Sequence, residues 1–389
     1  MSGRALFRWS AAAALALHAA LLLGSDGLRG GGDLTPHLRL IQRMADDPAL
    51  RSVYAPAYHV IGALAAPVTG LGAYPEWFAW LSAAAFIAAF RRFQRAAALP
   101  DACSAVFAWA PYHFALSWCL PKIEVAGYAI LLLGLACVLT RHRLAVAACV
   151  AAAFLFHTAA ALLLGLTGGV LALASRDPRS LFALAAGTLV ALPLPLAHVA
   201  AGCTFAQALL FSQYDYLRAA PSAHNLAQWD RILLLANPIA LAAAFAGARA
   251  LWRSQRPLAL VCAAIVVVYL NELWLAPFGM RSTLDALRAL TILAIPVAVC
   301  AGVAVGARPA AAQALVAVSA ILALAVTLWV VPAACVSKPI DLAGIAGFEV
   351  DRCMFRWRRV AGSGPGAEGG EVRPDPRVDR SAPREGAPQ

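Results

Sequence analysis

Long apolar runs, separated by short clusters of basic residues, fill most of this 389-residue chain. The first run extends from Trp9 to Gly24, and later runs follow one another between residues 77 and 331. A helix of about 20 apolar residues is long enough to cross the hydrocarbon core of a bilayer. The pattern therefore predicts an all-α, polytopic membrane protein with about eleven transmembrane helices.

Basic residues mark one end of nearly every predicted helix. Arg4 and Arg8 precede the first apolar run, and arginines also follow the runs that end near residues 90, 140, 251 and 305. Cytoplasmic loops of membrane proteins are enriched in Lys and Arg. We therefore expect the N-terminus in the cytoplasm and the loop of residues 25–74 on the periplasmic or extracellular side.

The apolar stretch from Leu144 to Ala174 is long for one regular span, and basic residues lie at both of its ends. A single helix would place these two basic flanks on opposite sides of the membrane. Two short helices that meet near His157 and Thr158 would keep both flanks in the cytoplasm, and we predict this arrangement.

The outer loop of residues 25–74 contains two helical patterns. Between Leu34 and Met44, apolar residues recur at roughly the helical period with arginines on the other side, which predicts an interfacial amphipathic helix. Pro56 to Val68 is a second apolar helix, and it is too short to span the bilayer. We expect this helix to lie at the interface or to dip into it.

Composition agrees with a membrane protein. Hydrophobic residues make up 62% of the chain and charged residues 13%, against about 45–50% and about 25% in soluble domains. The net charge of +11 would suit nucleic acid, but the arginines lie between apolar runs, so we expect no nucleic-acid partner. The nine cysteines form no CxxC motif, so the sequence offers no zinc or redox site.

The chain divides into a transmembrane domain at 1–335, a short outer segment at 336–361 and a tail at 362–389 whose composition predicts disorder. A second outer loop spans 199–230 within the first domain. Cys335 and Cys353 would both lie outside, where a disulfide can form. The abundance of Ala, Arg and Gly with little Lys is typical of a GC-rich bacterial genome and points to a bacterial inner membrane.

Asp33 is the first candidate for chemistry, because it follows a glycine-rich turn at the outer boundary of the first span. A carboxylate there can act as a general base or as the N-cap of the helix that starts at Leu34. His37 would share its face one turn later, as an orienting group, a phosphate or metal ligand, or a surface histidine. Tyr58 and His59 open the second loop helix and are candidate substrate-binding residues.

Lys122, Glu124 and His157 are candidate substrate-binding residues outside this loop. Lys122 and Glu124 lie within the predicted tight outer turn of residues 121–124, where a simple ion pair is the alternative. His157 lies within an apolar stretch, and ionisable groups in membranes usually line a cavity. The predicted pair of short helices would bring His157 near the outer surface.

Arg281 and Arg288 are candidate phosphate ligands near the start of a late helix. Arg281 lies on the predicted outer side, against the positive-inside pattern. The planar guanidinium group binds phosphate through two parallel hydrogen bonds. The alternative is an ion pair with Asp285, which would contribute little if exposed.

Three motifs carry a family resemblance. Asp33 lies in the first outer loop ahead of a helix, and Tyr54-Ala55-Pro56-Ala57-Tyr58-His59 then opens an apolar helix. The polar break Phe156-His157-Thr158 divides two apolar helices, and Arg288 opens a helix that contains Pro296. Together, across about residues 5–335, these motifs resemble the GT-C superfamily of membrane glycosyltransferases, which includes protein O-mannosyltransferases and the lipid A aminoarabinose transferase.

The resemblance implies an inverting glycosyltransferase that moves a sugar from a polyprenyl-phosphate donor to a lipid, glycan or protein acceptor at the outer face of the membrane. Asp33 would deprotonate the acceptor. Arg288, with help from Arg281, would hold the phosphate of the donor.

The motifs depart from the family at two points. Ala55 replaces the first of two prolines that the family often has. Leu34 and Thr35 supply no second acidic residue, although some branches carry one there. A divalent metal is therefore left without a second acidic ligand, and the sequence implies no other cofactor.

Other classes of function stay open. A transporter or flippase of a lipid-linked saccharide would need a charged cavity near mid-membrane and internal symmetry, and neither is clear in the sequence. A polysaccharide polymerase or ligase would carry its large outer loop late in the chain, whereas here it is early. A non-catalytic membrane scaffold is a further alternative.

Overall fold

The computed structural model describes residues 1–23, 34–46, 56–109, 123–200, 204, 237–270, 286–334, 348–350 and 357–359. Within these residues the chain is helical apart from two short strands, so the predicted all-α class is confirmed. The elements are α1 (Gly3–Leu23), α2 (Leu34–Asp46), α3 (Pro56–Thr69), α4 (Tyr74–Ala96), α5 (Asp101–Ala108), α7 (Ile123–Leu139), α8 (Arg143–Phe156), α9 (Thr158–Ala174), α10 (Pro178–Ala191), α11 (Pro193–Ala200), α16 (Pro238–Ser254), α17 (Arg256–Tyr269), α19 (Ala286–Val305), α20 (Pro309–Ala334), β1 (Phe348–Val350) and β2 (Trp357–Arg359).

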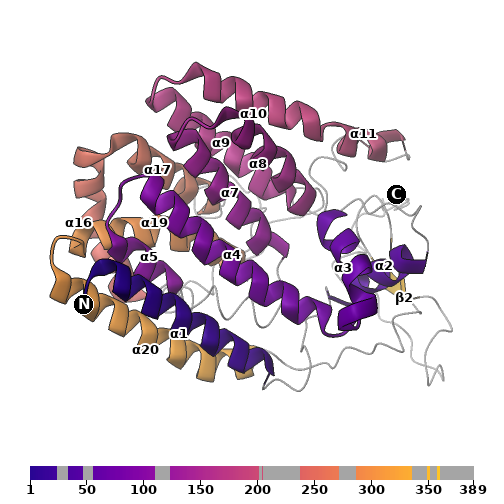
Figure 1. Cartoon of the computed structure of the whole chain (residues 1–389), viewed down its shortest axis with the longest axis horizontal. Coiled ribbons are helices and arrows are strands. Elements are labelled where there is room, and N and C mark those ends of the chain that lie inside the picture. Colours follow the sequence, from indigo (N-terminus) through magenta and orange to yellow (C-terminus); the bar gives the residue numbers. More distant parts are fainter. Residues whose placement is uncertain are drawn as a thin grey trace, which may run out of the picture.

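The long helices lie side by side in a bundle, and α2 and α3 lie at one end of it (Figure 1). One large cluster of buried apolar side chains runs through the bundle from α1 to α20. A second, smaller cluster joins α2 and α3 to the first residues of α4. We call α2 and α3 the cap, because they pack on the start of α4 at one end of the bundle (Figure 1).

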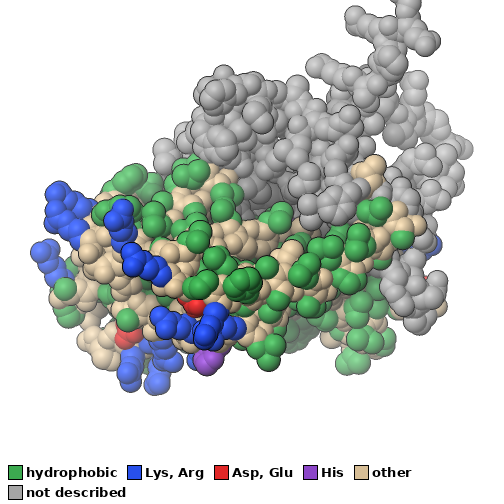
Figure 2. Space-filling view, turned by 90° about the horizontal axis from the view of Figure 1, so that it is seen from above, with side chains coloured by type: hydrophobic (Ala, Val, Ile, Leu, Met, Phe, Trp, Pro, Cys, Tyr) green, Lys and Arg blue, Asp and Glu red, His purple; other side chains and the backbone are tan. Residues whose placement is uncertain are grey.

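Arginines gather at the end of the bundle away from the cap (Figure 2). The start of α1 and the end of α4 meet there, since the guanidinium carbon of Arg91 lies 4.7 Å from the centre of the Phe7 ring. The start of α5 and the end of α19 join them, since Gly306 packs against Pro100. The sequence predicts this sorting of helix ends for the cytoplasmic side of a membrane protein.

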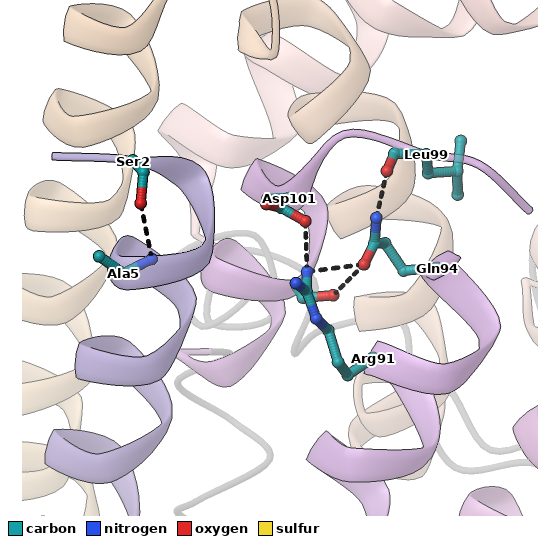
Figure 3. Close-up of polar contacts among 7 residues, drawn as sticks. Ser2, Ala5, Arg91, Gln94, Leu99 and Asp101 are labelled. Carbon is teal, nitrogen blue, oxygen red and sulfur yellow. Dashed lines mark hydrogen bonds and ion pairs between the residues drawn. The ribbon is translucent and has the colours of Figure 1, made fainter. Parts of the chain in front are cut away.

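A buried polar cluster holds α4 to α5 at this arginine end (Figure 3). Arg91 donates one hydrogen bond to Asp101 Oδ1 at 2.6 Å and another to Gln94 Oε1 at 2.7 Å. Gln94 in turn donates to the carbonyl oxygen of Leu99. Because Arg91 is only 7% exposed, its charge depends on this partner carboxylate rather than on water.

We expect Arg91→Leu to lower the free energy of unfolding by about 3 kcal/mol, because it leaves the Asp101 carboxylate partly buried without its cation. Arg92 is exposed on the same helix, so Arg92→Leu should change stability by about 0.5 kcal/mol or less. Thermal unfolding of the full chain in detergent measures both variants. Equal melting temperatures for the two would contradict the structural role of Arg91.

The predicted break near His157 is confirmed by the helix bounds. α8 ends at Phe156 and α9 begins at Thr158. His157 itself is extended, with φ −162° and ψ 112°. α8 and α9 also pack against each other, so the two helices form a hairpin.

The start of α8 and the end of α9, which are the two open ends of the hairpin, lie together at the arginine end. Asp177 follows α9, and its pKa is lowered first by the Ser180 hydroxyl, which donates to Oδ2 at 2.7 Å, and then by Arg143 and Arg141. Arg143 is the first residue of α8 and Arg141 lies two residues before it. Their effect on Asp177 therefore places the start of α8 near the end of α9. The hairpin therefore begins and ends on the same side, as the basic flanks predict.

The loop helices predicted at Leu34–Met44 and Pro56–Val68 are confirmed as α2 and α3. α4 begins at Tyr74, three residues before the predicted start, because Pro75 suits the first turn of a helix. The helix continues to Ala96, so it includes the arginines that follow the apolar run ending near residue 90. The predicted loop of residues 25–74 therefore ends where α4 begins.

The strands β1 and β2 are an addition to the predicted all-α class. They pair antiparallel, with Glu349 opposite Arg358, and β1 contacts α2 of the cap. Both strands fall within the segment 336–361 that the sequence predicts to be on the outer side. They are three residues long each, and such short strands leave little periodicity to detect.

One helical stretch of the described chain, Pro178–Ala197 with 20 residues, is long and apolar enough to cross a membrane by length and composition. Shorter apolar helices of 10–17 residues include α8, α9 and most of α7. The number of transmembrane helices therefore stays a prediction.

Candidate functional site

An apolar cluster positions the cap on the bundle. Leu38 and Ile41 of α2, Tyr58 of α3, and Tyr74 and Phe78 of α4 are all buried in it. Leu38 and Ile41 are three residues apart, so they share one face of α2. This face turns α2 toward α3 and fixes which polar residues of the two helices meet.

Gly62 allows the cap helices to approach closely. A Cβ atom at this position would lie 2.6 Å from Cδ1 of Ile41 and 2.8 Å from Cε1 of Tyr74. A glycine within a helix costs about 1 kcal/mol relative to alanine. Here the close packing of three elements offsets that cost.

His37 and His59 form a buried pair between the cap helices. Nδ1 of His37 and Nε2 of His59 are 2.8 Å apart, a hydrogen bond between two imidazole rings. The rings are stacked with centres 5.0 Å apart. Tyr58 lies edge-on to both rings, at 5.6 Å from His37 and 5.4 Å from His59. Three predicted site residues therefore meet within one cluster.

Tyr58 and Tyr74 tie α3 to the start of α4. The Tyr74 hydroxyl donates to the carbonyl oxygen of Tyr58 at 2.7 Å. The Tyr58 side chain is fully buried, and its hydroxyl has no hydrogen-bond partner among the described residues. Burial raises the pKa of Tyr58, so its phenol stays neutral at physiological pH.

Glu124 and His157 form a second buried pair. Oε1 of Glu124, in the first turn of α7, lies 3.9 Å from Nε2 of His157 at the break between α8 and α9. Gly127 makes room for the histidine, since a Cβ there would lie 2.9 Å from the Cβ of His157. The ring of Tyr128 lies 6.2 Å from that of His157.

Aromatic rings connect the two pairs. Tyr58 lies edge-on to Phe78 at 4.7 Å between ring centres, and Phe78 stacks on Phe156 at 6.4 Å. Phe156 directly precedes His157. The structure therefore brings His37, Tyr58, His59, Glu124 and His157 to one end of the bundle, opposite the arginine end.

The other predicted site residues are less completely described. Asp33, Lys122 and Arg281 lie outside the described residues, as do Cys335 and Cys353. Arg288 is in the first turn of α19, but its side chain is not described. The substrate-binding and catalytic roles of all these residues stay predictions.

Sequence reasoning missed Tyr74 and Phe78 as parts of the site, and it named Phe156 only as part of the break between two apolar helices. Tyr74 and Phe78 belong to α4 and Phe156 ends α8, and aromatic residues near a predicted interface are common in membrane proteins. Only the segment Tyr74-Pro75-Glu76-Trp77 hinted at a helix start with an anchoring tyrosine.

The polar groups of the described site are suited to hydrogen bonding with a ligand. Imidazole nitrogens and a carboxylate can accept or donate to hydroxyl groups of a ligand. Within the described ranges, no group of three His, Cys, Asp or Glu side chains is arranged to hold a metal ion. The predicted alternative of a divalent metal therefore gains no ligand set here.

Comparisons with protein-family models, curated proteins and solved structures find no match to this chain. The fold and the site define a helical bundle with a histidine-containing cap at the end away from its arginines.

Proposed function

We propose that this chain is a GT-C-like glycosyltransferase of a bacterial inner membrane, with about eleven spans and a cytoplasmic N-terminus. It transfers a sugar from a polyprenyl-phosphate donor to a lipid, glycan or protein acceptor of the envelope. The transfer takes place at the outer face and inverts the anomeric carbon.

The cap is the observation that carries this proposal. α2 and α3 come from the predicted first outer loop, and they pack against α4 and α8. They carry His37 and His59 to the end of the bundle that also holds Glu124 and His157. The resemblance to the GT-C superfamily rests on a first outer loop of this kind. In this proposal that loop packs next to the ionisable groups of the site.

The direction of α19 supports the role of Arg288. The last turns of α19 lie at the arginine end, where Gly302 packs against Cys103 of α5. Arg288 is in the first turn of the same 20-residue helix, so its backbone lies toward the cap end. An arginine there is suited to a phosphate that enters the site from the outer leaflet.

The exposed face of α3 supports access from the lipid. Leu64 and Val68 are 75% and 88% exposed, and the helix contains no charged residue. An apolar helix face of this kind can lie in the interfacial region of a bilayer. A donor with an isoprenoid chain would approach the cap along the same layer.

The reaction forms one bond and breaks one. The acceptor oxygen bonds to the anomeric carbon while the bond from that carbon to the phosphate oxygen breaks, and Asp33 takes the acceptor proton. The polyprenyl phosphate leaves with an added negative charge, which Arg288 stabilises. Direct binding of the sugar by His37, Tyr58 and His59 stays a prediction, because all three side chains are buried in the cap.

Purified full-length protein in proteoliposomes tests the proposal. The probes are polyprenyl-phosphate mannose and polyprenyl-phosphate glucose with labelled sugars, supplied with an envelope extract as a source of acceptor. We expect the label to move from one donor to the extract, with release of polyprenyl phosphate. Intact donor that crosses the bilayer without turnover would favour a flippase, and unchanged donor on its original side would favour a scaffold.

A further inference from the structure

The His37–His59 contact links the two cap helices through one hydrogen bond. Nδ1 of His37 belongs to the first turn of α2, and Nε2 of His59 belongs to the first turn of α3. His37 is 9% exposed and His59 is fully buried. No backbone hydrogen bond between α2 and α3 accompanies the pair among the described residues, so the side-chain bond is a specific polar link between the start of α2 and the rest of the cap.

This hydrogen bond limits the protons that the pair can hold. A bond between two ring nitrogens needs an N–H on one side and a lone pair on the other. When both rings are protonated, all four nitrogens carry hydrogen, so no lone pair is left to accept the bond. Two positive charges would also face each other in a buried site, which is unfavourable.

The helices and the strand that pack around the histidine pair carry other ionisable groups. Tyr58 is buried and neutral, and Tyr74 donates its hydroxyl hydrogen to a backbone carbonyl. α2 also carries Arg39, Arg43 and Asp46, of which Arg39 donates to Gln42. Further groups on the neighbouring elements are Glu76 of α4, Glu349 of β1 and His157 after α8. None of these groups is altered in the His59→Gln variant described below, which therefore separates a pH effect of the histidine pair from an effect of its neighbours.

We propose that His59 is a positioning residue that acts through His37. It holds the N-terminal turn of α2 on α3 as long as at least one of the two rings is neutral. Asp33 directly precedes α2, so the pair also fixes the chain next to the general base of the proposed function. The inference rests on that function only for its effect on transfer; the hold on α2 is a property of the cap itself.

The sign of the pH dependence follows from the proton count. With α2 released, both rings are free to take up a proton near the ordinary imidazole range of about 6.5. The released form therefore binds more protons than the docked form below this pH, and docking weakens as pH falls. Each unit of pH below about 6.5 lowers the ratio of docked to released α2 by up to about tenfold.

Hydrogen exchange of residues 34–46 in the purified full chain, corrected for the intrinsic rate, measures this docking without any substrate. In the natural chain we expect the protection of α2 to be at least tenfold lower at pH 5.0 than at pH 7.5. In His59→Gln the amide nitrogen takes the place of Nε2 and does not titrate in this range. Its protection should change by less than threefold between the two pH values.

His37→Asn is the second variant, since the Asn amide takes the place of Nδ1 and should behave in the same way if His59→Gln does not fold. His59→Leu should give low protection at both pH values. The exposed His142 offers the matched control, and His142→Gln should keep the pH dependence of the natural chain.

Two results would overturn the inference. One is a natural chain whose α2 protection is the same at both pH values. The other is a glutamine variant that loses protection at pH 5.0 as much as the natural chain. Loss of sugar transfer at every pH together with pH-dependent protection of α2 would instead count against the proposed function and leave the positioning role standing.

Discussion

Asp33→Asn is expected to lower the rate of sugar transfer by at least about 100-fold, because general base catalysis typically contributes a factor of 10²–10⁴. The asparagine side chain is similar in size and can still cap α2, but it cannot take up the acceptor proton. The protein should therefore be produced and purified in normal amount. Transfer of labelled sugar by purified protein in proteoliposomes measures the effect.

Asp46 provides the matched control for Asp33. It ends α2, is exposed, and belongs to the same outer loop, so Asp46→Asn should leave transfer within about twofold of the natural rate if it is a solvated surface group. Normal transfer by Asp33→Asn would contradict the assignment of the base. An equal loss in both variants would indicate a general effect of loop charge instead.

Gly247→Val should prevent α16 from docking on α19. A Cβ on Gly247 would lie 1.9 Å from the carbonyl oxygen of Cys300 and 2.7 Å from its carbonyl carbon. These are backbone atoms within a helix, so they cannot move aside as the end of a side chain could. Overpacking of a core typically costs about 1–3 kcal/mol, and the valine side chain adds two more carbons to this overlap, so we expect a loss above about 3 kcal/mol. The measurement is the melting temperature and the size-exclusion profile of the full chain in detergent.

Gly165 and Gly169 of α9 separate the steric effect from the effect of helix propensity. A Cβ at either position would meet no heavy atom of the described residues within 4 Å. Alanine should therefore be tolerated there, with a gain of up to about 1 kcal/mol from its higher helix propensity. A Gly247→Val protein as stable as Gly165→Ala would mean that α16 and α19 do not pack as closely as described.

Local patterns predicted much of the fold. The helical period between Leu34 and Met44 identified α2, and the basic flanks of residues 144–174 identified the break at His157. Both are properties of a short stretch of chain, so they are visible without knowing what that stretch contacts. The position of α4 relative to its apolar run was less accurate, because a proline start and helical arginines extend a helix beyond its apolar part.

The contacts within the site could not be predicted in the same way. His37 and His59 are 22 residues apart, and Glu124 and His157 are on different helices. Their pairing depends on how α2 turns on α3 and how closely α7 approaches α9, which Gly62 and Gly127 permit. These packing details have no periodic signal, so the sequence could name the residues but not which partner each would have.

The lengths of α8 and α9 set how deep the site lies. The two helices have 14 and 17 residues, which correspond to about 21 and 25 Å at 1.5 Å per residue. The hydrocarbon core of a bilayer is about 30 Å thick. For helices close to the bilayer normal, a hairpin that starts at the cytoplasmic surface thus stops roughly 5–9 Å below the outer one. In the proposed enzyme, Glu124 and His157 would therefore form the floor of a recess in the membrane, into which a water-soluble acceptor must descend while the donor stays at its own depth in the lipid.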